Sequence, residues 1–589
     1  MLAVGGWLRL SGSNWDAGHH LHPDERYLSI VADNLSWPRS IGAYLDVKTS
    51  PLSPYNTEEG KDYVYGTLPL FATKLVAGAL GRDDYGHLNL VGRRLSALLD
   101  LGTTILVFLI ARLVLDRRGG EATAGGLVAA AAYALTVTSI QLSHFGTTDS
   151  WLVFFGTLTF YLAARAVVAP PAGAQYFELG WVATGAAFGL TVACKASGVL
   201  SGLAVAMAIA GRMLVSGQRA GAREAAIRLA AAVAATAVPA YLCFRLVSPY
   251  AFQSSFWLNP TISHAYRAAL ASQQAALDGK YLAPPGYQWL LSTRVWDPLK
   301  NLVVWQLGIP LGVVAIVGLC ALVAALVRSL LVLRRRRLPP AEVMAGTIQL
   351  MLVATVFLQF FWFSTLFAHS GRYLVSLVPL LAVTAAYGLV RLLRRRTVVF
   401  AAAAAVLLVA TGAYAIGFHT IYERTNTRVA ASDWIVRHVP AGAVIANEHW
   451  DDSLPLGRDF EQYRGVAVPV FDPDDATKLG KLDRALVDAD YYIVSSPRAW
   501  RTIGRLPDRF PLMVRFYRQL FAGRLGLEPV ASFDVEPRLL GYNLDDRGAE
   551  EAFWVYDHPP VTIFHRTERF SAARLRQILC TPRIAGVCG

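Results

Sequence analysis

The amino-acid sequence predicts a polytopic α-helical membrane protein that carries a C-terminal α/β domain. Three observations predict this fold class. Only 16% of the 589 residues are charged, against roughly 25% in an ordinary soluble protein. Many apolar stretches approach the roughly 20 residues that cross a bilayer. Acidic and basic residues become frequent after residue 418, where no stretch could span a membrane.

Charge divides the chain into two domains, residues 1–418 and 419–589. The sequence from Phe418 to the end holds 22 Lys and Arg and 23 Asp and Glu, whereas the preceding part holds 33 and 19. The excess positive charge therefore lies entirely in the membrane part. This distribution argues against a nucleic-acid partner and for charge placed by membrane topology.

We expect about 11 membrane spans. The apolar segment Met1–Leu10 is only half as long as a span. We interpret it as the end of a truncated first span, with a surface anchor as the alternative. The ten full candidate spans are Leu88–Leu115, Ala122–Leu142, Trp151–Ala169, Gly180–Cys194, Gly198–Val215, Leu229–Val247, Leu302–Leu326, Val343–Phe367, Tyr373–Val390 and Val398–Phe418.

Arginine clusters at alternate ends of successive spans predict the orientation. Positively charged loops remain cytoplasmic. The first external loop (residues 11–87), the loops at 144–149, 249–301 and 369–372, and everything after residue 418 are then extracytoplasmic, and the protein is a multi-pass protein of the cell membrane. The clusters are Arg117 and Arg118; Arg212, Arg219, Arg223 and Arg228; Arg334–Arg337; and Arg391 with Arg394–Arg396.

The C-terminal domain is expected to contain a small, mostly parallel sheet with helices on its faces, because short β-branched runs alternate with helical patterns. It has no Gly-rich phosphate loop, so a nucleotide-binding role has no support. Its cysteines, Cys580 and Cys588, could pair in an oxidising compartment or remain free. The expected strands are Ala443–Ala446, Val466–Val470, Tyr491–Ser495 and Val561–His565.

The first external loop contains the sequence His22-Pro23-Asp24-Glu25-Arg26. Pro23 can begin a helix, and the helix dipole stabilises the two acids in its first turn. Helix-start chemistry alone explains this pattern. The alternative is that one carboxylate is a general base beside a water-excluded pocket. His22 and Arg26 are further site candidates.

A second acidic position, Asp149, follows His144 in a polar stretch between two apolar spans on the same predicted face. A carboxylate at the end of a span must find a partner or face a cavity, because exposure to lipid is costly. Asp149 could instead cap the next helix. The two interpretations are compatible, and His144 is a further candidate.

Two cations accompany these acids on the external side. Lys195 interrupts a pair of apolar helices, and Arg372-Tyr373 opens another span just after His369. Snorkelling explains many such lysines, but the positive-inside rule disfavours cations on this face. We therefore expect Lys195 and Arg372 to bind a negative ligand, and arginine binds phosphate in a bidentate manner.

Four separate loops thus supply acids and cations to one face of the membrane. This arrangement suits a reaction between a lipid-linked phosphate and a polar acceptor. The cations would hold the phosphate leaving group, and a carboxylate would take a proton from the attacking hydroxyl.

At these residues the chain resembles the GT-C class of glycosyltransferases, in particular the bacterial family similar to protein O-mannosyltransferases and to the aminoarabinose transferase of lipid A (glycosyltransferase family 39). Those enzymes have an acidic pair in the first external loop and a second acid later in the chain. The resemblance covers roughly residues 21–390. Its motifs here are Asp24-Glu25-Arg26-Tyr27, Asp149, Tyr65–Leu70, Gly92–Leu98, Lys195–Gly198 and Arg372-Tyr373.

The resemblance implies a polyprenyl-phosphate sugar donor and an inverting transfer to a hydroxyl of a protein, lipid or cell-envelope glycan. It implies that Asp24 acts as the base or positions the acceptor, supported by Glu25 and Asp149. Lys195, Arg372 and Tyr373 would face the donor phosphate. No His/Asp spacing defines a metal site, although a divalent metal is compatible with acids facing the site.

The C-terminal domain differs from that of the eukaryotic mannosyltransferases. Aromatic and acidic residues there, such as Trp434, Trp450 and Tyr556, could bind sugar or acceptor. A packed core is the alternative, because aromatic residues are usually buried.

Two other functions compete with glycosyl transfer. A secondary transporter would use buried charges for ion coupling, but such charges lie near the bilayer midplane and accompany internal repeats, and the sequence shows no repeat. A lipid-linked oligosaccharide ligase or polymerase would use a similar donor with different substrates.

Overall fold

The structure, a computed structural model, describes residues 1–115, 120–169, 179–216, 221–333, 339–393 and 395–588. The chain divides into two compact units. The membrane unit comprises residues 1–13, 23–278 and 294–417, and the C-terminal unit comprises residues 14–22, 279–293 and 418–589. The division thus lies next to the expected boundary at residue 418. However, the C-terminal unit also takes in two pieces of the loops that the sequence analysis assigned to the membrane domain.

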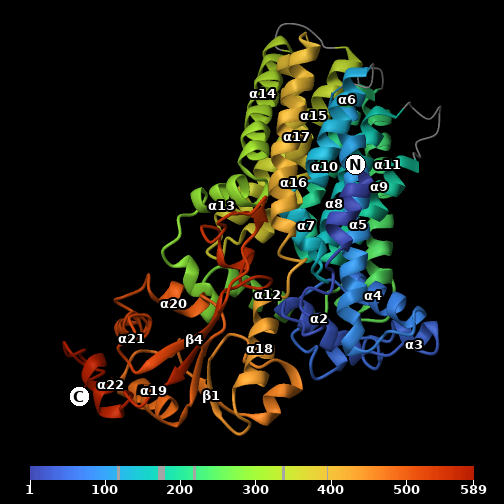
Figure 1. Cartoon of the computed structure of the whole chain (residues 1–589). Helices are drawn as coiled ribbons and strands as arrows, with labels where there is room; N and C mark the ends of the chain where they lie inside the picture. Colours follow the sequence, from blue (N-terminus) through green and yellow to red (C-terminus); the bar gives the residue numbers. More distant parts are fainter. Residues whose placement is uncertain (116–119, 170–178, 217–220, 334–338, 394, 589) are drawn as a thin grey trace. The chain divides into compact units, whose positions relative to one another are not determined.

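The membrane unit is helical (Figure 1). Long helices are joined by short helices and one-turn segments that carry the polar loops. The helices are α1 (Leu2–Leu10), α2 (Pro23–Asp33), α3 (Ile41–Leu45), α4 (Thr67–Ala79), α5 (Tyr85–Val114), α6 (Gly120–Ala134), α7 (Val137–Ser143), α8 (Asp149–Val168), α9 (Leu179–Cys194), η2 (Ala196–Ser201), α10 (Gly202–Ser216), α11 (Ala222–Val247), α12 (His264–Leu277), α13 (Trp296–Asn301), η5 (Leu302–Gln306), α14 (Ile309–Leu333), α15 (Pro340–Ser364), η6 (Gly371–Leu377), α16 (Val378–Leu393) and α17 (Thr397–His419).

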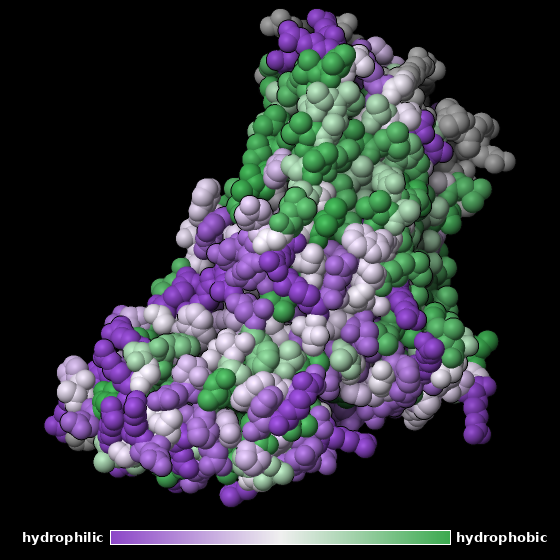
Figure 2. All heavy atoms as spheres, viewed as in Figure 1, coloured by the Kyte–Doolittle hydropathy of each residue, from purple (hydrophilic) through white to green (hydrophobic). Residues whose placement is uncertain are grey.

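Within the described residues, eight helices are long and apolar enough to cross a membrane, and a ninth if the bent pair α6–α7 is one span. Their apolar side chains form the hydrophobic surface shown in green in Figure 2. The expected span at Gly180–Cys194 corresponds to α9, which has 16 residues, and Met1–Leu10 corresponds to the nine-residue α1. The protein is therefore polytopic, whereas the count of about 11 spans stays a prediction.

Helices α9 and α11 pack with their backbones in close approach. A Cβ at Gly185 would lie 2.0 Å from the Thr236 carbonyl oxygen, and one at Gly189 would lie 2.2 Å from that of Ala240. Lipid gives no hydrophobic drive for helices to associate, so small residues four apart allow close van der Waals packing instead. These contacts hold the middle of α9, the helix that Lys195 follows.

Helix α1 is attached to the bundle by a buried ion pair. Arg9 Nε donates to Asp100 Oδ2 of α5 at 2.5 Å, and Arg9 Nη1 donates to the Ala134 carbonyl at 2.7 Å. The Tyr133 hydroxyl also donates to Asp100. Buried charges in a membrane protein need such partners, so α1 is an integral element of the membrane unit.

The predicted orientation depends partly on arginines that lie outside the described residues: Arg117, Arg118, Arg219, Arg334–Arg337 and Arg394. The described ones lie near helix ends, and the orientation itself stays a prediction. Arg212 lies near the end of α10, Arg223 and Arg228 near the start of α11, and Arg391 near the end of α16.

The C-terminal unit contains a five-stranded sheet with the order β2-β1-β3-β7-β4. Strand β1 pairs in parallel with β2 and β3, whereas β7 is antiparallel to both β3 and β4. The strands are β1 (Val444–Glu448), β2 (Arg464–Val468), β3 (Tyr491–Val494), β4 (Leu527–Phe533), the small pair β5 (Arg538–Leu539) and β6 (Tyr542–Asn543), and β7 (Val561–Arg566). The helices are α18 (Thr427–His438), α19 (Ala476–Asp488), α20 (Arg498–Ile503), α21 (Pro511–Phe521) and α22 (Ala572–Leu579).

The expectation of a mostly parallel sheet is therefore wrong in part, because the sheet is mixed. Strand β4, which was not expected, lies at the edge of the sheet. Most of its residues are exposed or half-buried, and position 529 is a proline. Prolines are tolerated at sheet edges, and an exposed strand lacks the apolar run on which the prediction relied. Cys580 and Cys588, left open by the sequence, form a disulfide after α22.

A buried charge cluster around His558 ties the start of the C-terminal unit to its end. The Nδ1 atom of His558 lies 2.5 Å from Asp557 Oδ1, and its Nε2 atom lies 2.8 Å from Asp546 Oδ2. The Tyr422 hydroxyl donates to Asp557 Oδ2 at 2.9 Å. The two carboxylates raise the pKa of His558 to about 10 against the opposing effect of burial, so the imidazole is a buried cation at neutral pH.

This cluster predicts a pH dependence of stability. The folded pKa of His558 lies above its ordinary value of 6.5, so its contribution is fully present below pH 6.5 and is lost as the pH rises toward 10. We expect the melting temperature of the C-terminal unit to fall over this range in the wild type, and to fall less in His558→Gln. Thermal unfolding followed at several pH values measures this. The exposed His438→Gln is the matched control, and equal slopes for the wild type and His558→Gln would contradict the prediction.

Candidate functional site

Glu25 is the buried member of the acidic pair at the start of α2. Arg93 of α5 donates to it through Nε at 2.9 Å and through Nη2 at 2.5 Å. The backbone N–H of Gly146, in the loop before α8, donates to Glu25 Oε2 at 2.7 Å. Its side chain is only 1% exposed. This carboxylate is therefore fully engaged in joining three elements, which suits a supporting role.

Asp24, by contrast, lies at a partly open position. Its side chain is 22% exposed, and its Oδ2 lies 2.6 Å from Arg372 Nη1 at the start of η6. The Tyr65 hydroxyl, just before α4, hydrogen-bonds to Asp24. Burial and the charge of Asp24 raise the pKa of Tyr65 well above its ordinary value, so Tyr65 is a stable proton donor to this carboxylate.

Asp149 begins α8 and is 2% exposed. Its Oδ1 accepts a hydrogen bond from Lys195 Nζ at 2.9 Å, and its Oδ2 lies 3.4 Å from Arg372 Nε. Arg372 thus lies between Asp24 and Asp149. The structure brings together the first external loop, the start of α8, the end of α9 and the start of η6, which are the four segments that the sequence analysis placed on one face.

The four charges of Asp24, Asp149, Lys195 and Arg372 balance one another. Desolvating such groups is costly, and mutual pairing offsets that cost. An anion that reached Lys195 and Arg372 would compete with the two carboxylates for the same cations. An external anion can therefore take the place of a carboxylate on one of these cations, and the displaced carboxylate then loses its cation partner.

Glycine at position 66 allows Tyr65 to reach this cluster. The Gly66 N–H donates to the Cys194 carbonyl at 3.1 Å, and a Cβ at position 66 would lie 1.9 Å from the Ala193 carbonyl oxygen. The chain of the first loop therefore lies directly against the end of α9, one residue before Lys195. No side chain other than hydrogen fits there.

A cavity of about 430 Å³ opens beside the charged cluster. This volume is typical of ligand sites. Tyr65, Lys195, Arg372 and Tyr373 line this cavity, and the centre of the Tyr373 ring lies 5.4 Å from Lys195 Nζ. The lining also contains the polar Ser197, Gln273 and Gln274 and apolar side chains, among them Leu200, Leu270, Leu277, Trp362 and Leu366. The cavity thus offers two cations to an anion and apolar surface to a hydrocarbon chain.

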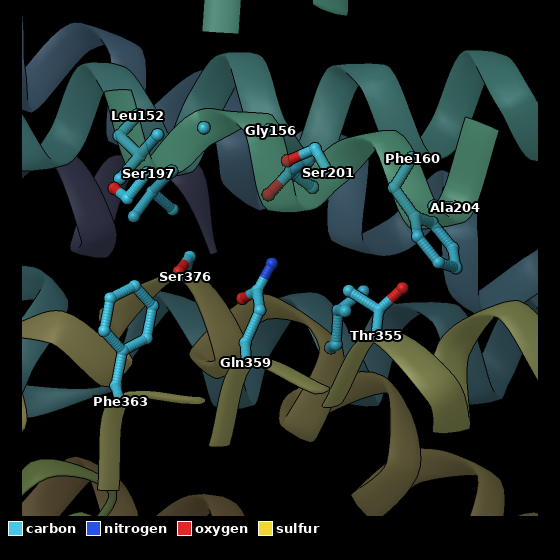
Figure 3. Close-up of a pocket in the computed structure, with 14 residues that line it drawn as sticks. Leu152, Gly156, Phe160, Ser197, Ser201, Ala204, Thr355, Gln359, Phe363 and Ser376 are labelled. Carbon is cyan, nitrogen blue, oxygen red and sulfur yellow. The ribbon is translucent and has the colours of Figure 1, made fainter. Parts of the chain in front are cut away.

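A smaller cavity of about 30 Å³ shares Ser197 and Phe363 with the larger one. Figure 3 shows Gln359 pointing into it opposite Ser201. Within the described part of the chain, Gln359 Oε1 and Thr355 Oγ1 are buried without a hydrogen-bond partner. A volume of this size holds about two water molecules. The unpaired oxygens of Gln359 and Thr355 favour hydration of this cavity.

The four further candidates lie in different surroundings. Both ring nitrogens of His144 face carbonyl oxygens, Nδ1 that of Ile140 at 2.9 Å and Nε2 that of Ser11 at 2.8 Å. His369 Nδ1 lies 3.1 Å from the Leu366 carbonyl, and burial lowers the pKa of His369. Arg26 is half-buried on α2. His22 belongs to the C-terminal unit, where its ring packs against Tyr556 with centroids 4.5 Å apart.

Arg93, Tyr65 and Trp362 could not be assigned to the site from the sequence alone. Arg93 and Tyr65 lie within motifs that carry the family resemblance, so their positions were marked but not their roles. Trp362 lies inside a long apolar helix, where no sequence signal separates a residue of a cavity wall from one facing lipid.

A divalent metal at this site stays a prediction of the sequence. The described residues contain no group of three or more His, Cys, Asp or Glu side chains arranged to hold one. Asp24 and Asp149 instead have the Arg372 guanidinium between them. We assign no step of the chemistry to a metal.

No family model matches the chain, and no curated protein matches it by sequence. Solved structures of glycosyltransferases show a distant likeness. The apo oligosaccharyltransferase of Archaeoglobus fulgidus is 12% identical, with 93% of this chain and 74% of that chain covered and a TM-score of 0.49. ArnT from Cupriavidus metallidurans, bound to undecaprenyl phosphate, is 14% identical, with 93% and 97% covered and a TM-score of 0.39.

A third structure, the protein O-mannosyltransferase complex of S. cerevisiae bound to its sugar donor, is 16% identical over 43% of this chain and 33% of that chain, with a TM-score of 0.32. The three are GT-C glycosyltransferases, the class that the sequence motifs resemble.

We expect Glu25 and Arg93 to stabilise the protein together, so that the effect of changing one depends on the presence of the other. Arg93→Met leaves a buried carboxylate without its partner, which typically costs about 3–5 kcal/mol. We expect a large fall in the melting temperature of the purified protein, and partial recovery in the double variant Glu25→Leu/Arg93→Met. The exposed neighbour Arg94→Met is the matched control. Additive effects of the two single changes would show that the pair is not coupled.

Proposed function

We propose that the protein is a membrane glycosyltransferase that moves a sugar from a polyprenyl-phosphate donor to an acceptor hydroxyl at the extracytoplasmic face, with inversion at the sugar carbon. The observation that carries the proposal is the position of Arg372. This residue lines the cavity and is ion-paired with Asp24, so binding of an anion and release of a carboxylate are linked through one side chain.

The cavity supports a donor that is anionic at one end and apolar along its length. In this proposal the phosphate binds Lys195 and Arg372, and the prenyl chain lies along Leu270, Trp362 and Leu366. Arginine presents several donors in a geometry that matches phosphate oxygens. The apolar wall removes the prenyl chain from water, which contributes favourable free energy in proportion to the area buried.

The chemical step follows from this exchange of partners. When phosphate binds Arg372, Asp24 loses its cation and becomes a better proton acceptor. Asp24 then takes the proton of the acceptor hydroxyl while the hydroxyl oxygen attacks the sugar carbon. The bond from that carbon to the phosphate oxygen breaks, and polyprenyl phosphate leaves on Lys195 and Arg372. The electron pair remains on the phosphate, whose charge the two cations stabilise.

The other acids position these groups. Asp149 holds Lys195 and Arg372 through its two oxygens, and Glu25 fixes the first turn of α2 through Arg93. Tyr65 orients the Asp24 carboxylate by its hydrogen bond. Preorganised groups of this kind reduce the reorganisation needed during the reaction.

Two features support an extracytoplasmic site in the cell membrane. On α16 and its preceding turn, Arg372 lies at one end and Arg391 at the other. The Arg391 end belongs to the arginine-rich face, which the positive-inside rule places in the cytoplasm. The disulfide between Cys580 and Cys588 supports an oxidising compartment for the C-terminal unit.

The site is less suited to a secondary transporter. Transporter sites lie near the bilayer midplane, whereas Asp149 and Arg372 lie at helix starts and Lys195 follows a helix end. The buried pair Arg9–Asp100 is engaged internally. An oligosaccharide ligase or polymerase would share the donor chemistry and differ in its acceptor. In this proposal the acceptor is a hydroxyl of a glycan, lipid or protein.

Asp24→Asn tests the proposal most directly. The change keeps the shape of the side chain and removes its basicity, so we expect kcat to fall by about 10²–10⁴-fold. Binding of undecaprenyl phosphate should be retained or tightened, because Arg372 loses a competing carboxylate. Arg372→Ala should weaken that binding. Sugar transfer from a panel of undecaprenyl-phosphate sugars and direct binding of undecaprenyl phosphate to the purified protein provide the two measurements.

Asp33→Asn is the matched control, because Asp33 is an acid at the other end of α2, away from the charged cluster. Wild-type transfer by Asp24→Asn would remove Asp24 from the mechanism. Passage of a substrate across vesicles without any transfer would favour a transporter and overturn the proposed function.

A further inference from the structure

A groove of about 410 Å³ is formed entirely by residues of the C-terminal unit. It lies between strand β2, which contributes Val466 and Ala467, and helix α19, which contributes Lys481, Arg484 and Asp488. Strand β2 is an edge strand of the five-stranded sheet, so the sheet itself does not close this side. A groove of this volume falls within the range of ligand sites.

The charges that line the groove are balanced. The lining contains two cations, Lys481 and Arg484, and two acids, Asp472 and Asp488. Lys481 Nζ lies 3.1 Å from Asp472 Oδ2. The carboxylates would repel an anion, and the two cations would repel a cation. The lining therefore favours a ligand without net charge.

The hydrogen-bonding capacity of these groups narrows the class of ligand further. Ionised carboxylates only accept hydrogen bonds, whereas Lys and Arg side chains only donate them. A hydroxyl both donates and accepts, so a ligand with several hydroxyls can satisfy both kinds of group at once. The same lining contains the apolar side chains of Val466, Pro469 and Ala485. A sugar ring matches this mixture, because it combines hydroxyls at its edge with C–H groups on its faces.

An exposed aromatic ring lies next to the groove. His449 lines the groove, and the centroid of its ring lies 5.6 Å from that of Trp450. Trp450 is 44% exposed, whereas Trp434 and Tyr556, the other aromatic candidates from the sequence, are half-buried. The face of an aromatic ring is negative, so it attracts the C–H groups on the face of a sugar. Trp450 is therefore suited to stack against a sugar ring.

The backbone of Trp450 is fixed in an uncommon conformation. Its φ is 77°, in the left-handed region that bulky residues rarely adopt. Arg498 Nη1 donates to the Trp450 carbonyl at 2.8 Å, and Arg428 Nη2 donates to Asp451 Oδ1 at 2.7 Å. Residues in this conformation persist where surrounding contacts fix them, and they cluster at ligand-binding sites. The indole is thus presented to solvent by a backbone that the C-terminal unit holds in place.

The groove and the exposed ring share one edge of the sheet. His449 and Trp450 directly follow β1, and Pro469 directly follows β2. Because β1 and β2 are parallel, their carboxyl ends lie at the same edge. Ligands of open α/β sheets bind outside the carboxyl ends of the strands.

We propose that this groove binds a neutral oligosaccharide, with one sugar ring stacked on Trp450 and the hydroxyls of neighbouring sugars bonded to the four charged side chains of the lining. This site goes beyond the proposed function, because glycan binding by the C-terminal unit does not require sugar transfer by the membrane unit. A peptide that extends the sheet is the less suited ligand, because β2 has only five residues and short edge strands disfavour the addition of another strand.

Titration of the purified full-length protein with neutral hexasaccharides of glucose, mannose or galactose tests this site in the absence of a lipid-linked donor. We expect saturable binding of at least one of them, measured by calorimetry. Trp450→Ala should weaken this binding by about tenfold, because the stacking contact is lost, and Trp450→Phe should retain part of it. Tyr542→Ala is the matched control, because Tyr542 is an exposed aromatic residue of the same unit that does not line the groove.

Variants of α19 provide a test that does not depend on the backbone around Trp450. Lys481 and Arg484 are exposed, so Lys481→Ala and Arg484→Gln should retain the wild-type melting temperature. Each should weaken hexasaccharide binding by about threefold to tenfold, because hydrogen bonds to the sugar are lost. A hexasaccharide of galacturonic acid, which is anionic, should bind more weakly than that of galactose.

The proposal is overturned if none of the three neutral hexasaccharides binds at millimolar concentration. Equal affinity of the wild type, Trp450→Ala and Arg484→Gln overturns it as well, and so does tighter binding of the galacturonic acid hexasaccharide. An extended peptide that binds the protein and slows amide exchange in β2, where the hexasaccharides do not, would identify an edge-strand partner in place of a glycan.

The same titration separates this inference from the proposed function. Asp24→Asn should bind the hexasaccharide as tightly as the wild type does. Loss of binding in Asp24→Asn would assign the glycan to the membrane unit and overturn the groove as its site. If no hexasaccharide binds while Asp24→Asn abolishes transfer, the inference fails and the proposed function stands.

Discussion

The buried guanidinium of Arg93 is the interaction on which the rest of the site depends. Through its separate nitrogens it binds the Ser13 carbonyl and the Glu25 carboxylate, and Glu25 in turn accepts the Gly146 N–H. One side chain of α5 therefore fixes the end of the segment that follows α1, the start of α2 and the loop before α8. Asp24 directly precedes Glu25, and Asp149 follows Gly146 by three residues, so both acids lie close to a group that this network holds.

The second layer of organisation is electrostatic. Every charge of the Asp24, Asp149, Lys195 and Arg372 cluster has a partner inside the cluster. Such a cluster is stable at the edge of an apolar helical bundle, where an unpaired charge would be expensive. It can also change partners, because an incoming anion can take the place of a carboxylate on Lys195 or Arg372 and leave that carboxylate without its cation.

The sequence predicted the broad architecture because that architecture depends on composition. Long apolar stretches correspond to α5, α8, α11 and α14–α17, and the change in charge near residue 418 lies next to the start of the last part of the C-terminal unit. The convergence of Asp24, Asp149, Lys195 and Arg372 was also expected, because positive-inside topology places their loops on one face. That inference required no knowledge of how the helices pack.

Other features could not be predicted, because they depend on contacts between distant parts of the chain. Nothing local in residues 14–22 or 279–293 indicates that they belong to the C-terminal unit. The arginine that pairs with Glu25 lies 68 residues away in the sequence. Nothing in the sequence distinguishes it from other arginines as that partner. The strand β4 escaped notice because an exposed edge strand lacks the apolar run by which strands are recognised.

The contact of Gly66 with the end of α9 has a consequence for how the cavity can adapt. Two backbone segments touch there with no side chain between them, so neither can retreat from the other without losing the hydrogen bond that joins them. The cavity therefore cannot widen by separation of these two segments, and next to Tyr65 and Lys195 it must adapt by rotation of side chains.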